Sequence, residues 1–322
     1  MVRAFKMDEN FRIGISSCLL GNMVRWNAGH KRDRFLTDTL GRFVEYIPVC
    51  PEVEAGFGIP RESMRLVGDP DKPRLITFKS KTDGTHQMTH WATARVQELE
   101  KEDLCGFIFK SDSPSSGMIR VKVYNDKGMP EKKGVGMFAR AYMDHFPLIP
   151  VEDDGRLHDP AIRENFIERI FTLKRWRDFT AKSPKMATLI DFHTRNKLLF
   201  LAHSQKHYRL MGKLVAEGKK LPIKELLDRY VRLMMEALAL KTTTKKNINV
   251  LQHLMGYFKK ELSGDEKQEL LEIFDQYRRE LVPLIVPITL VNHYVRKYDQ
   301  PYLKHQTYLN PHPLELKLRT HV

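Results

Sequence analysis

Two cysteines stand at the ends of strand-like segments, where metal or redox chemistry is often placed. Cys18 lies near the end of the apolar run "RIGISSCLL", and Cys50 ends the run "VEYIPVC". Thiolates are the preferred protein ligands of zinc, copper(I) and iron–sulfur clusters. The chain contains no C-x-x-C spacing, so the zinc-ribbon and ferredoxin patterns are absent. From the residues alone, metal binding and plain burial of the two thiols both remain open.

A carboxylate and a serine-rich loop are the next candidates. Glu52 follows Cys50 by two residues, and a carboxylate there could act as a general acid or base; a solvated loop glutamate is the alternative. The loop "SDSPSSG" follows the apolar run at residues 106–109 and contains Ser113 and Ser116. Loops at strand ends often carry binding residues, and a second strand-like run, "MIRVKVY", follows this one.

Basic and aromatic residues cluster in three stretches. The stretch "VRWNAGHKRDRF" is a candidate site for an anionic or base-like substrate, because Trp can stack on a base and Arg can contact a phosphate. Its candidate binding residues are Arg25, Trp26, His30 and Lys31. The basic and aromatic residues in 191–215 and 249–262 indicate a helical face that binds an RNA backbone. The candidates there are Lys197, His203, Lys206, Tyr208, Arg209, His253, Tyr257 and Lys259. His203 and His207 have the i, i+4 spacing of a helical metal pair, but without an accompanying Glu the RNA interpretation is favoured.

The elements that position these residues alternate in the first half of the chain. Strands are predicted at 12–20, 44–50 and 105–110, with a short one at 75–79, and helices at 30–43 and at 85–103, where Thr85 is the expected N-cap. This order predicts a partly parallel α/β sheet. Because ligands bind outside the carboxyl ends of such strands, Cys18, Cys50 and the serine loop should converge. Cys105 begins its strand and should lie at the opposite edge.

Segments with helical periodicity dominate the second half, and the proline-interrupted tail at 302–319 is expected to be irregular. Helices are predicted at 161–180, 186–217, 222–240, 245–262 and 265–282, after a linker near 150–160. The predicted architecture is therefore an α/β N-terminal domain, residues 1–155, followed by an all-α C-terminal domain, residues 161–322.

Charge separates the two halves of the 322-residue chain. Residues 1–160 carry 24 Lys and Arg against 23 Asp and Glu, whereas residues 161–322 carry 30 against 17. Such a surplus points to a nucleic acid or a membrane surface, with solvated lysines on a soluble domain as the alternative. No run approaches the ~20 apolar residues of a membrane span, and "MVRAFKMDENFR" lacks an apolar signal core. Three cysteines, an odd and small number, do not suggest a disulfide scaffold. We expect a cytoplasmic protein without membrane association, and no protein partner is evident.

The motifs together resemble known families. The segments "ISSCLLG", "VRWNAGHKRD", "VCPEVEAGFGIPR" and "FKSDSPSSGM" resemble the thiouracil desulfidase family over about residues 11–140. The second half, with "DFHTRNKLLFLAHSQKHYR", "NVLQHLMGYFKK" and "PLIVPITLVNHYV", is similar to the YbgA-type domain. The fusion of the two resembles RudS-type tRNA 4-thiouridine desulfidases, and the resemblance covers nearly the whole chain.

The resemblance implies a function and a site. The first domain would hold a [4Fe-4S] cluster through three cysteines, and the iron left free of protein ligands would take up the sulfur of 4-thiouridine in tRNA, giving uridine and sulfide. Cys18 and Cys50 match two of the ligands, Glu52 matches the catalytic glutamate, and Ser113 matches a serine that orients the substrate. The YbgA-type domain would hold tRNA.

One position departs from the family pattern. The family loop reads SPSCG, and its fourth position, the third cluster ligand, is Ser116 in this chain. A hydroxyl is a harder donor than the thiolate that cluster iron prefers. Three explanations are open. Ser116 would bind the cluster weakly, or Cys105 would supply the third thiolate. In the third explanation, the protein would have lost desulfidase activity and kept RNA binding. A desulfidase acting on free thiouracil is a further alternative.

Overall fold

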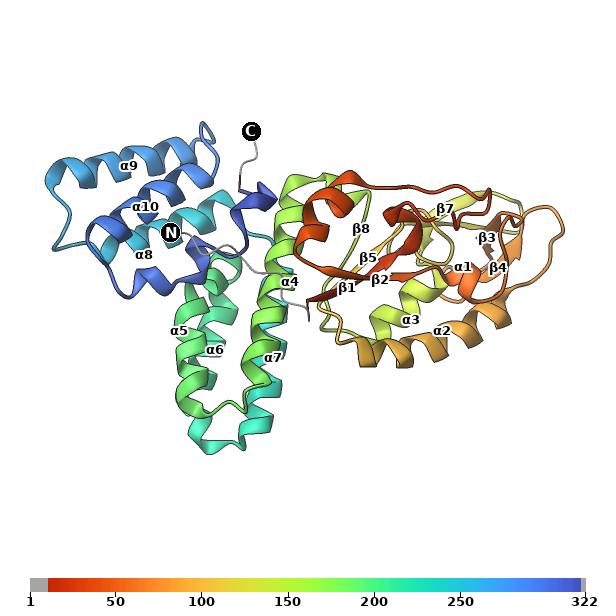
Figure 1. Cartoon of the computed structure of the whole chain (residues 1–322), viewed down its shortest axis with the longest axis horizontal. Helices are drawn as coiled ribbons and strands as arrows, with labels where there is room; N and C mark the ends of the chain where they lie inside the picture. Colours follow the sequence, from red (N-terminus) through yellow and green to blue (C-terminus); the bar gives the residue numbers. More distant parts are fainter. Residues whose placement is uncertain (1–10, 320–322) are drawn as a thin grey trace. The chain divides into compact units, whose positions relative to one another are not determined.

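The computed structural model describes residues 11–319, which divide between Asp159 and Pro160 into two compact units (Figure 1). Residues 1–10, which contributed to the expectation of a cytoplasmic protein, lie outside the described residues. Between residues 11 and 319, no helix combines the length and the apolar character that crossing a membrane requires.

A parallel sheet forms the centre of the first unit. Its four strands lie in the order β2-β1-β5-β8, and every neighbouring pair is parallel. The strands are β1 (Arg12–Ser16), β2 (Glu45–Val49), β5 (Phe107–Phe109) and β8 (Val151–Asp153). The predicted α/β architecture is confirmed. Residues 150–160, expected as a linker, instead contribute β8 and the short 3-10 turn η5 (Arg156–His158).

Close packing between β1 and β5 depends on a glycine. A Cβ on Gly14 would lie 2.2 Å from the ring of Phe107, so only glycine lets this ring cover the strand. Two helices, α2 (Thr85–Leu99) and α3 (Met137–His145), pack together beside the sheet (Figure 1). Their buried residues join those of β5 in one aromatic core of Phe107, Phe109, Phe138 and Tyr142. The helix predicted at 85–103 is confirmed, but Gly84 rather than Thr85 is its N-cap. The Thr85 hydroxyl instead accepts a hydrogen bond from Leu75 N.

A second, mixed sheet completes the first unit, in the order β4-β3-β6-β7. Its strands are β3 (Met64–Val67), β4 (Arg74–Thr77), β6 (Val121–Tyr124) and β7 (Pro130–Gly134). The predicted strands at 75–79 and in "MIRVKVY" correspond to β4 and β6. The helix predicted at 30–43 is largely wrong. That stretch forms only the π-helical turn η2 (Phe35–Thr39) and the 3-10 turn η3 (Leu40–Arg42).

The second unit is helical, as predicted, and ends in an irregular tail (Figure 1). Its last helix, at residues 285–297, was not predicted from the sequence. Its helices are α4 (Pro160–Thr180), α5 (Met186–His203), α6 (Gln205–Glu217), α7 (Ile223–Ala239), α8 (Thr244–Gly256), α9 (Gly264–Arg278) and α10 (Ile285–Lys297). The predicted helix 186–217 is broken at Ser204. This residue is extended, and its hydroxyl caps α6 by accepting a hydrogen bond from His207 N.

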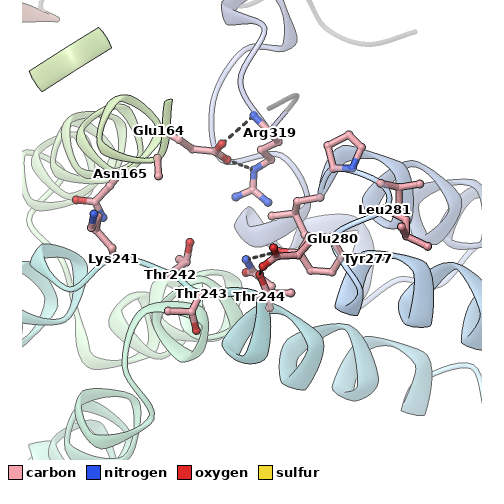
Figure 2. Close-up of a pocket in the computed structure, with 15 residues that line it drawn as sticks. Glu164, Asn165, Lys241, Thr242, Thr243, Thr244, Tyr277, Glu280, Leu281 and Arg319 are labelled. Carbon is pink, nitrogen blue, oxygen red and sulfur yellow. Dashed lines mark hydrogen bonds and ion pairs between the residues drawn. The ribbon is translucent and has the colours of Figure 1, made fainter. Parts of the chain in front are cut away.

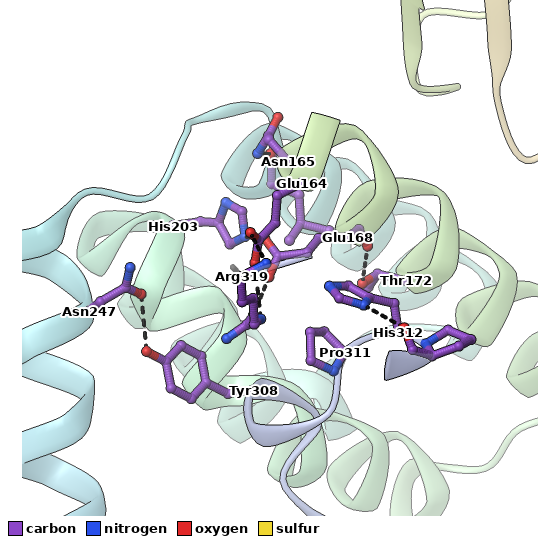
Figure 3. A network of polar contacts seen from close by, with 12 residues as sticks. Glu164, Asn165, Glu168, Thr172, His203, Asn247, Tyr308, Pro311, His312 and Arg319 are labelled. Atoms are coloured by element: carbon purple, nitrogen blue, oxygen red, sulfur yellow. Dashed lines mark hydrogen bonds and ion pairs between the residues drawn. The ribbon is translucent and has the colours of Figure 1, made fainter. Parts of the chain in front are cut away.

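A buried polar network ties the tail to α4 (Figure 3). The Arg319 guanidinium pairs with Glu168 through Nη2 and with Glu164 through Nε. His203 adds a contact from its Nε2 to a Glu168 oxygen at 3.1 Å. Burial raises the pKa of Glu168, but Arg319 and His203 outweigh that effect and lower it to about 2. The carboxylate is therefore charged in the folded protein at neutral pH, and removing Arg319 would leave it poorly compensated.

Candidate active site

One pocket of about 390 Å³ lies at the carboxyl ends of the parallel strands. Cys18 lies in the 3-10 turn η1 (Ser17–Leu20), directly after β1, and Cys50 is the N-cap of the short helix α1 (Pro51–Glu54), directly after β2. The loop after β5 brings Ser113 and Ser116 to the same pocket. Parallel strand ends meet at one edge of a sheet, so the convergence expected from the sequence is present.

Cys105 lies at the opposite end of the sheet. Its backbone N–H donates to Arg12 O at the start of β1, and the residue is fully buried. Cys18, in contrast, follows the end of β1. The length of the strand therefore separates the two thiols, and Cys105 is not among the residues that line the pocket. This position removes the alternative in which Cys105 supplies a third thiolate.

Glu52 is the carboxylate at the centre of the pocket's contacts. Its Oε1 accepts hydrogen bonds from Ser115 Oγ at 2.5 Å and from Ser113 Oγ at 3.3 Å. Its Oε2 lies 3.6 Å from Arg61 Nη2 and 3.7 Å from Cys50 Sγ. The carboxylate therefore touches the serine loop, a guanidinium and a thiol at once. Neither Ser115 nor Arg61 was among the site residues predicted from the sequence.

The serine loop is held in one conformation by its own backbone. Ser113 Oγ accepts from the backbone N–H of Ser115 at 3.3 Å and of Ser116 at 3.1 Å, and Ser113 O accepts from Gly117 N. The Ser115 carbonyl in turn accepts from Phe138 N and Ala139 N in the first turn of α3. Ser116 is 3% exposed and lines the pocket. The loop thus fixes the Ser113 hydroxyl next to Glu52.

Both thiols of the pocket favour the protonated state. Burial, followed by the nearby Glu52 charge, raises the pKa of Cys18 to about 11 and that of Cys50 to about 12. Lys110 and Arg25 act in the opposite direction on Cys18. Metal ligation requires thiolates and so releases protons. A metal or cluster bound by these residues would displace one proton from each cysteine.

Basic residues surround the mouth of the pocket. Of the four candidates in residues 24–35, Arg25, Trp26 and Lys31 line it, and the Trp26 side chain is 48% exposed. His30 does not belong to the lining, and its Nδ1 accepts from Arg32 N. Lys110 also lines the pocket, where its Nζ pairs with Asp154 at 2.9 Å.

The RNA-binding candidates of the helical unit are mostly at its surface. Lys206, Arg209, His253, Tyr257 and Lys259 are exposed, and Lys197 and Tyr208 are partly so. The ring of Tyr257 stacks on that of Tyr302 at 4.6 Å between centroids, and Lys197 Nζ lies 5.2 Å from the Tyr302 centroid. These three residues, here called the tyrosine pair with its lysine, bring together a stacking surface and a positive charge.

The prediction that His203 belongs to an RNA-binding face is wrong. Its side chain is fully buried, and both ring nitrogens have partners within the protein, Leu240 O at 2.7 Å and Glu168 Oε2 at 3.1 Å (Figure 3). The i, i+4 spacing with His207 does not place both on one helix face, because the helix breaks at Ser204 between them. His203 is a structural residue of the core.

Two family models match the chain. Residues 13–154 match the family described as 2-thiouracil desulfurase, and residues 197–313 match a family described as a protein of unknown function, DUF1722. A solved structure of a [4Fe-4S]-dependent thiouracil desulfidase, TudS, is 25% identical, covering 46% of this chain and 94% of that chain with a TM-score of 0.38. The match to the family model identifies the first unit as a 2-thiouracil desulfurase domain.

A relative identifies the family of the chain. The uncharacterized protein YbgA of Escherichia coli (strain K12) is 32% identical over 152 residues, which is 47% of this chain and 90% of YbgA. The chain belongs to the YbgA family and joins a YbgA-type domain to a 2-thiouracil desulfurase domain.

The donor set of the pocket fits an iron–sulfur group at two positions. Cys18 and Cys50 offer soft thiol donors, and Ser116 offers a hydroxyl at the position where the sequence resemblance places a third ligand. Across residues 11–319, no group of three or more His, Cys, Asp and Glu side chains is arranged to hold a metal ion. A site made here would therefore combine two sulfur ligands with an oxygen ligand.

Proposed function

We propose that the protein is a desulfidase that converts 4-thiouridine in tRNA to uridine with release of sulfide. The observation that carries the proposal is the convergence of Cys18, Cys50, Glu52 and Ser113 in one pocket of a 2-thiouracil desulfurase domain. The reaction is a hydrolysis in which a C=S bond is replaced by C=O and water supplies the oxygen and both protons of the sulfide. No external oxidant or reductant is needed.

A [4Fe-4S] cluster would be held by Cys18 and Cys50, with Ser116 as the third ligand. When bound, the group supplies a Lewis-acidic iron for the soft thiocarbonyl sulfur. The free thiols are protonated, as their raised pKa values indicate. Assembly therefore requires loss of two protons, and we expect it to be favoured at alkaline pH.

Glu52 is the proposed acid–base residue. Its Oε1 accepts hydrogen bonds from the Ser113 and Ser115 hydroxyls, and Arg61 lies beside its Oε2. An ionised carboxylate can accept a proton from water as the oxygen attacks the pyrimidine carbon. Ser113, fixed by the N–H groups of its own loop, can turn its single O–H from Glu52 to the substrate and orient the ring.

The helical domain supports tRNA rather than a free base as the substrate. It carries a surplus of 13 positive charges, 30 Lys and Arg against 17 Asp and Glu. Polyanion binding through such charges weakens steeply with salt. The tyrosine pair with its lysine adds a surface on which an unstacked base could lie. A free thiouracil would need neither feature.

The test is nucleoside analysis of tRNA that contains 4-thiouridine, after incubation with anaerobically reconstituted protein. We expect loss of 4-thiouridine, a matching gain of uridine and release of sulfide, all absent in Cys50→Ala. Conversion of free thiouracil without conversion of tRNA would favour the free-base alternative. Salt-sensitive tRNA binding without any conversion by the loaded protein would instead favour a non-catalytic RNA-binding protein, which is what Ser116 suggests.

A further inference from the structure

A second cavity, of about 420 Å³, lies within the helical unit (Figure 2). It is formed by the start of α4, the loop before α8, the end of α9 with the loop that follows, and the tail at Arg319. The volume is within the usual range of small-molecule sites. Neither the proposed desulfurisation nor the RNA-binding candidates involve the residues that line it.

Arg319 gives this cavity a buried donor. The residue is 4% exposed, and its guanidinium points into the cavity (Figure 2). Its Nε and Nη2 pair with Glu164 and Glu168. Its Nη1 is buried and has no hydrogen-bond partner within the described part of the chain. A buried N–H without an acceptor costs about 1–3 kcal/mol. A ligand oxygen at this atom would remove the cost.

The charges around Arg319 disfavour an anion. Two carboxylates, Glu164 and Glu168, already offset this one guanidinium. The lining also contains one further cation, Lys241, and one further anion, Glu280. Together with Arg175, whose charge also acts on Glu168, these groups carry no net charge. A phosphate or carboxylate would add negative charge to a site that has no surplus of positive charge, so the acceptor at Nη1 should be a neutral carbonyl oxygen.

The remaining lining requires a ligand that is apolar on its faces and polar at its edge. Leu281, Pro283, Leu284 and the Tyr277 ring form apolar walls. Acceptors are available beside them. The Asn165 amide nitrogen donates to Leu238 O, and its Oδ1 can accept a hydrogen bond from a ligand. Glu280 accepts a long hydrogen bond of 3.4 Å from Thr244. A flat ring with a carbonyl next to an N–H matches this arrangement.

We propose that this cavity binds a small neutral cyclic amide, of which uracil is a simple example. Its carbonyl would accept from Arg319 Nη1, and its ring N–H would donate to Asn165 or Glu280. The site would be separate from the pocket of the desulfurase domain. It does not depend on the proposed function, because it is built wholly from residues of the helical unit.

Calorimetric titration of the full chain with uracil and with uridine tests the proposal. Ala161 is exposed and borders the cavity, so Ala161→Trp should fill it and weaken binding at least tenfold. Ala181 is also exposed, just past the other end of α4, and Ala181→Trp should bind like the unchanged protein. Arg319→Gln should weaken binding similarly, provided that circular dichroism shows a folded chain; if it does not fold, Ala161→Trp decides.

Three results would overturn the proposal. The first is that neither uracil nor uridine binds at millimolar concentration. The second is that phosphate or acetate binds while uracil and uridine do not. The third is that Ala161→Trp binds uracil and uridine as well as Ala181→Trp does. The last result would assign any observed binding to another site, including the desulfurase pocket. Desulfidase activity of the same preparations is measured separately, so failure of this site and failure of the proposed function are distinguishable.

Discussion

Replacing Glu52 by glutamine should make the two pocket thiols more acidic. Glu52→Gln keeps the shape of the side chain and an oxygen for Ser113 and Ser115, but removes the negative charge. That charge is, after burial, the largest cause of the raised pKa values of both Cys18 and Cys50. Burial itself does not change in the variant, so the thiol pKa values should fall without returning to their ordinary value.

The size of the effect follows from the distance between the charges. Cys50 Sγ and Glu52 Oε2 are 3.7 Å apart. At about this separation, two unit charges interact by ~1 kcal/mol in water and ~4 kcal/mol near a protein surface. One pKa unit corresponds to about 1.4 kcal/mol. The pKa of Cys50, which is about 12, should therefore fall by about 1–2 units, because burial, the larger cause of its rise, remains.

The assay is the rate of iodoacetamide alkylation at each cysteine of the metal-free protein as a function of pH, followed by peptide mass spectrometry. At pH 8 the thiolate fraction, and with it the rate at Cys50, should rise at least about tenfold in Glu52→Gln. Buried Cys105 is the internal reference. Glu62→Gln is the matched control, because Glu62 lines the same pocket but accepts from Lys79 N and Ser80 N. An unchanged profile at Cys50 in Glu52→Gln would refute the electrostatic description of the pocket.

Three further predictions concern the cluster, the helical core and RNA binding. Ser116→Cys supplies the third thiolate and should raise the iron content per chain after anaerobic reconstitution; unchanged iron would mean that Ser116 is not a ligand position. Arg319→Met leaves Glu168 buried and poorly compensated, so urea unfolding should show a loss of about 3–5 kcal/mol; a loss below ~1 kcal/mol would contradict the assigned role of this network. Tyr257→Ala removes half of the stacked pair and should weaken tRNA binding at fixed salt by about 1–3 kcal/mol in a filter-binding assay, whereas undiminished affinity would exclude this surface.

The site was predictable where it depended on the order of the elements. Alternating strands and helices indicated a parallel sheet, and parallel strands end at one edge. Cys18, Cys50 and the serine loop could therefore be placed together, and Cys105 apart from them. Arg61 and Ser115 could not be found in this way. Arg61 reaches Glu52 from a loop that no periodic pattern describes, and Ser115 is one of several serines in a polar turn.

Strand β7 of the second sheet and the burial of His203 could not be predicted from the sequence pattern for a related reason. Strand β7 has the sequence PEKKG, and four of its five residues are exposed, so it has no alternation of apolar and polar residues. His203 lies in a run of histidines and lysines that resembles a solvent-facing surface. It is buried because Ser204 ends the helix beside it and because Glu168, 35 residues earlier, provides its partner. Contacts at such sequence separation leave no local signal.

The most direct test of the central claim is the iron and acid-labile sulfide content of protein purified without oxygen. We expect iron and sulfide in equal amounts, at fewer than about four of each per chain because the Ser116 hydroxyl is a weaker ligand than a thiolate. Both should be lost in Cys18→Ala and in Cys50→Ala and retained in Cys105→Ala. Iron that persists at the same level when both Cys18 and Cys50 are replaced would contradict the assignment of the pocket as the cluster site.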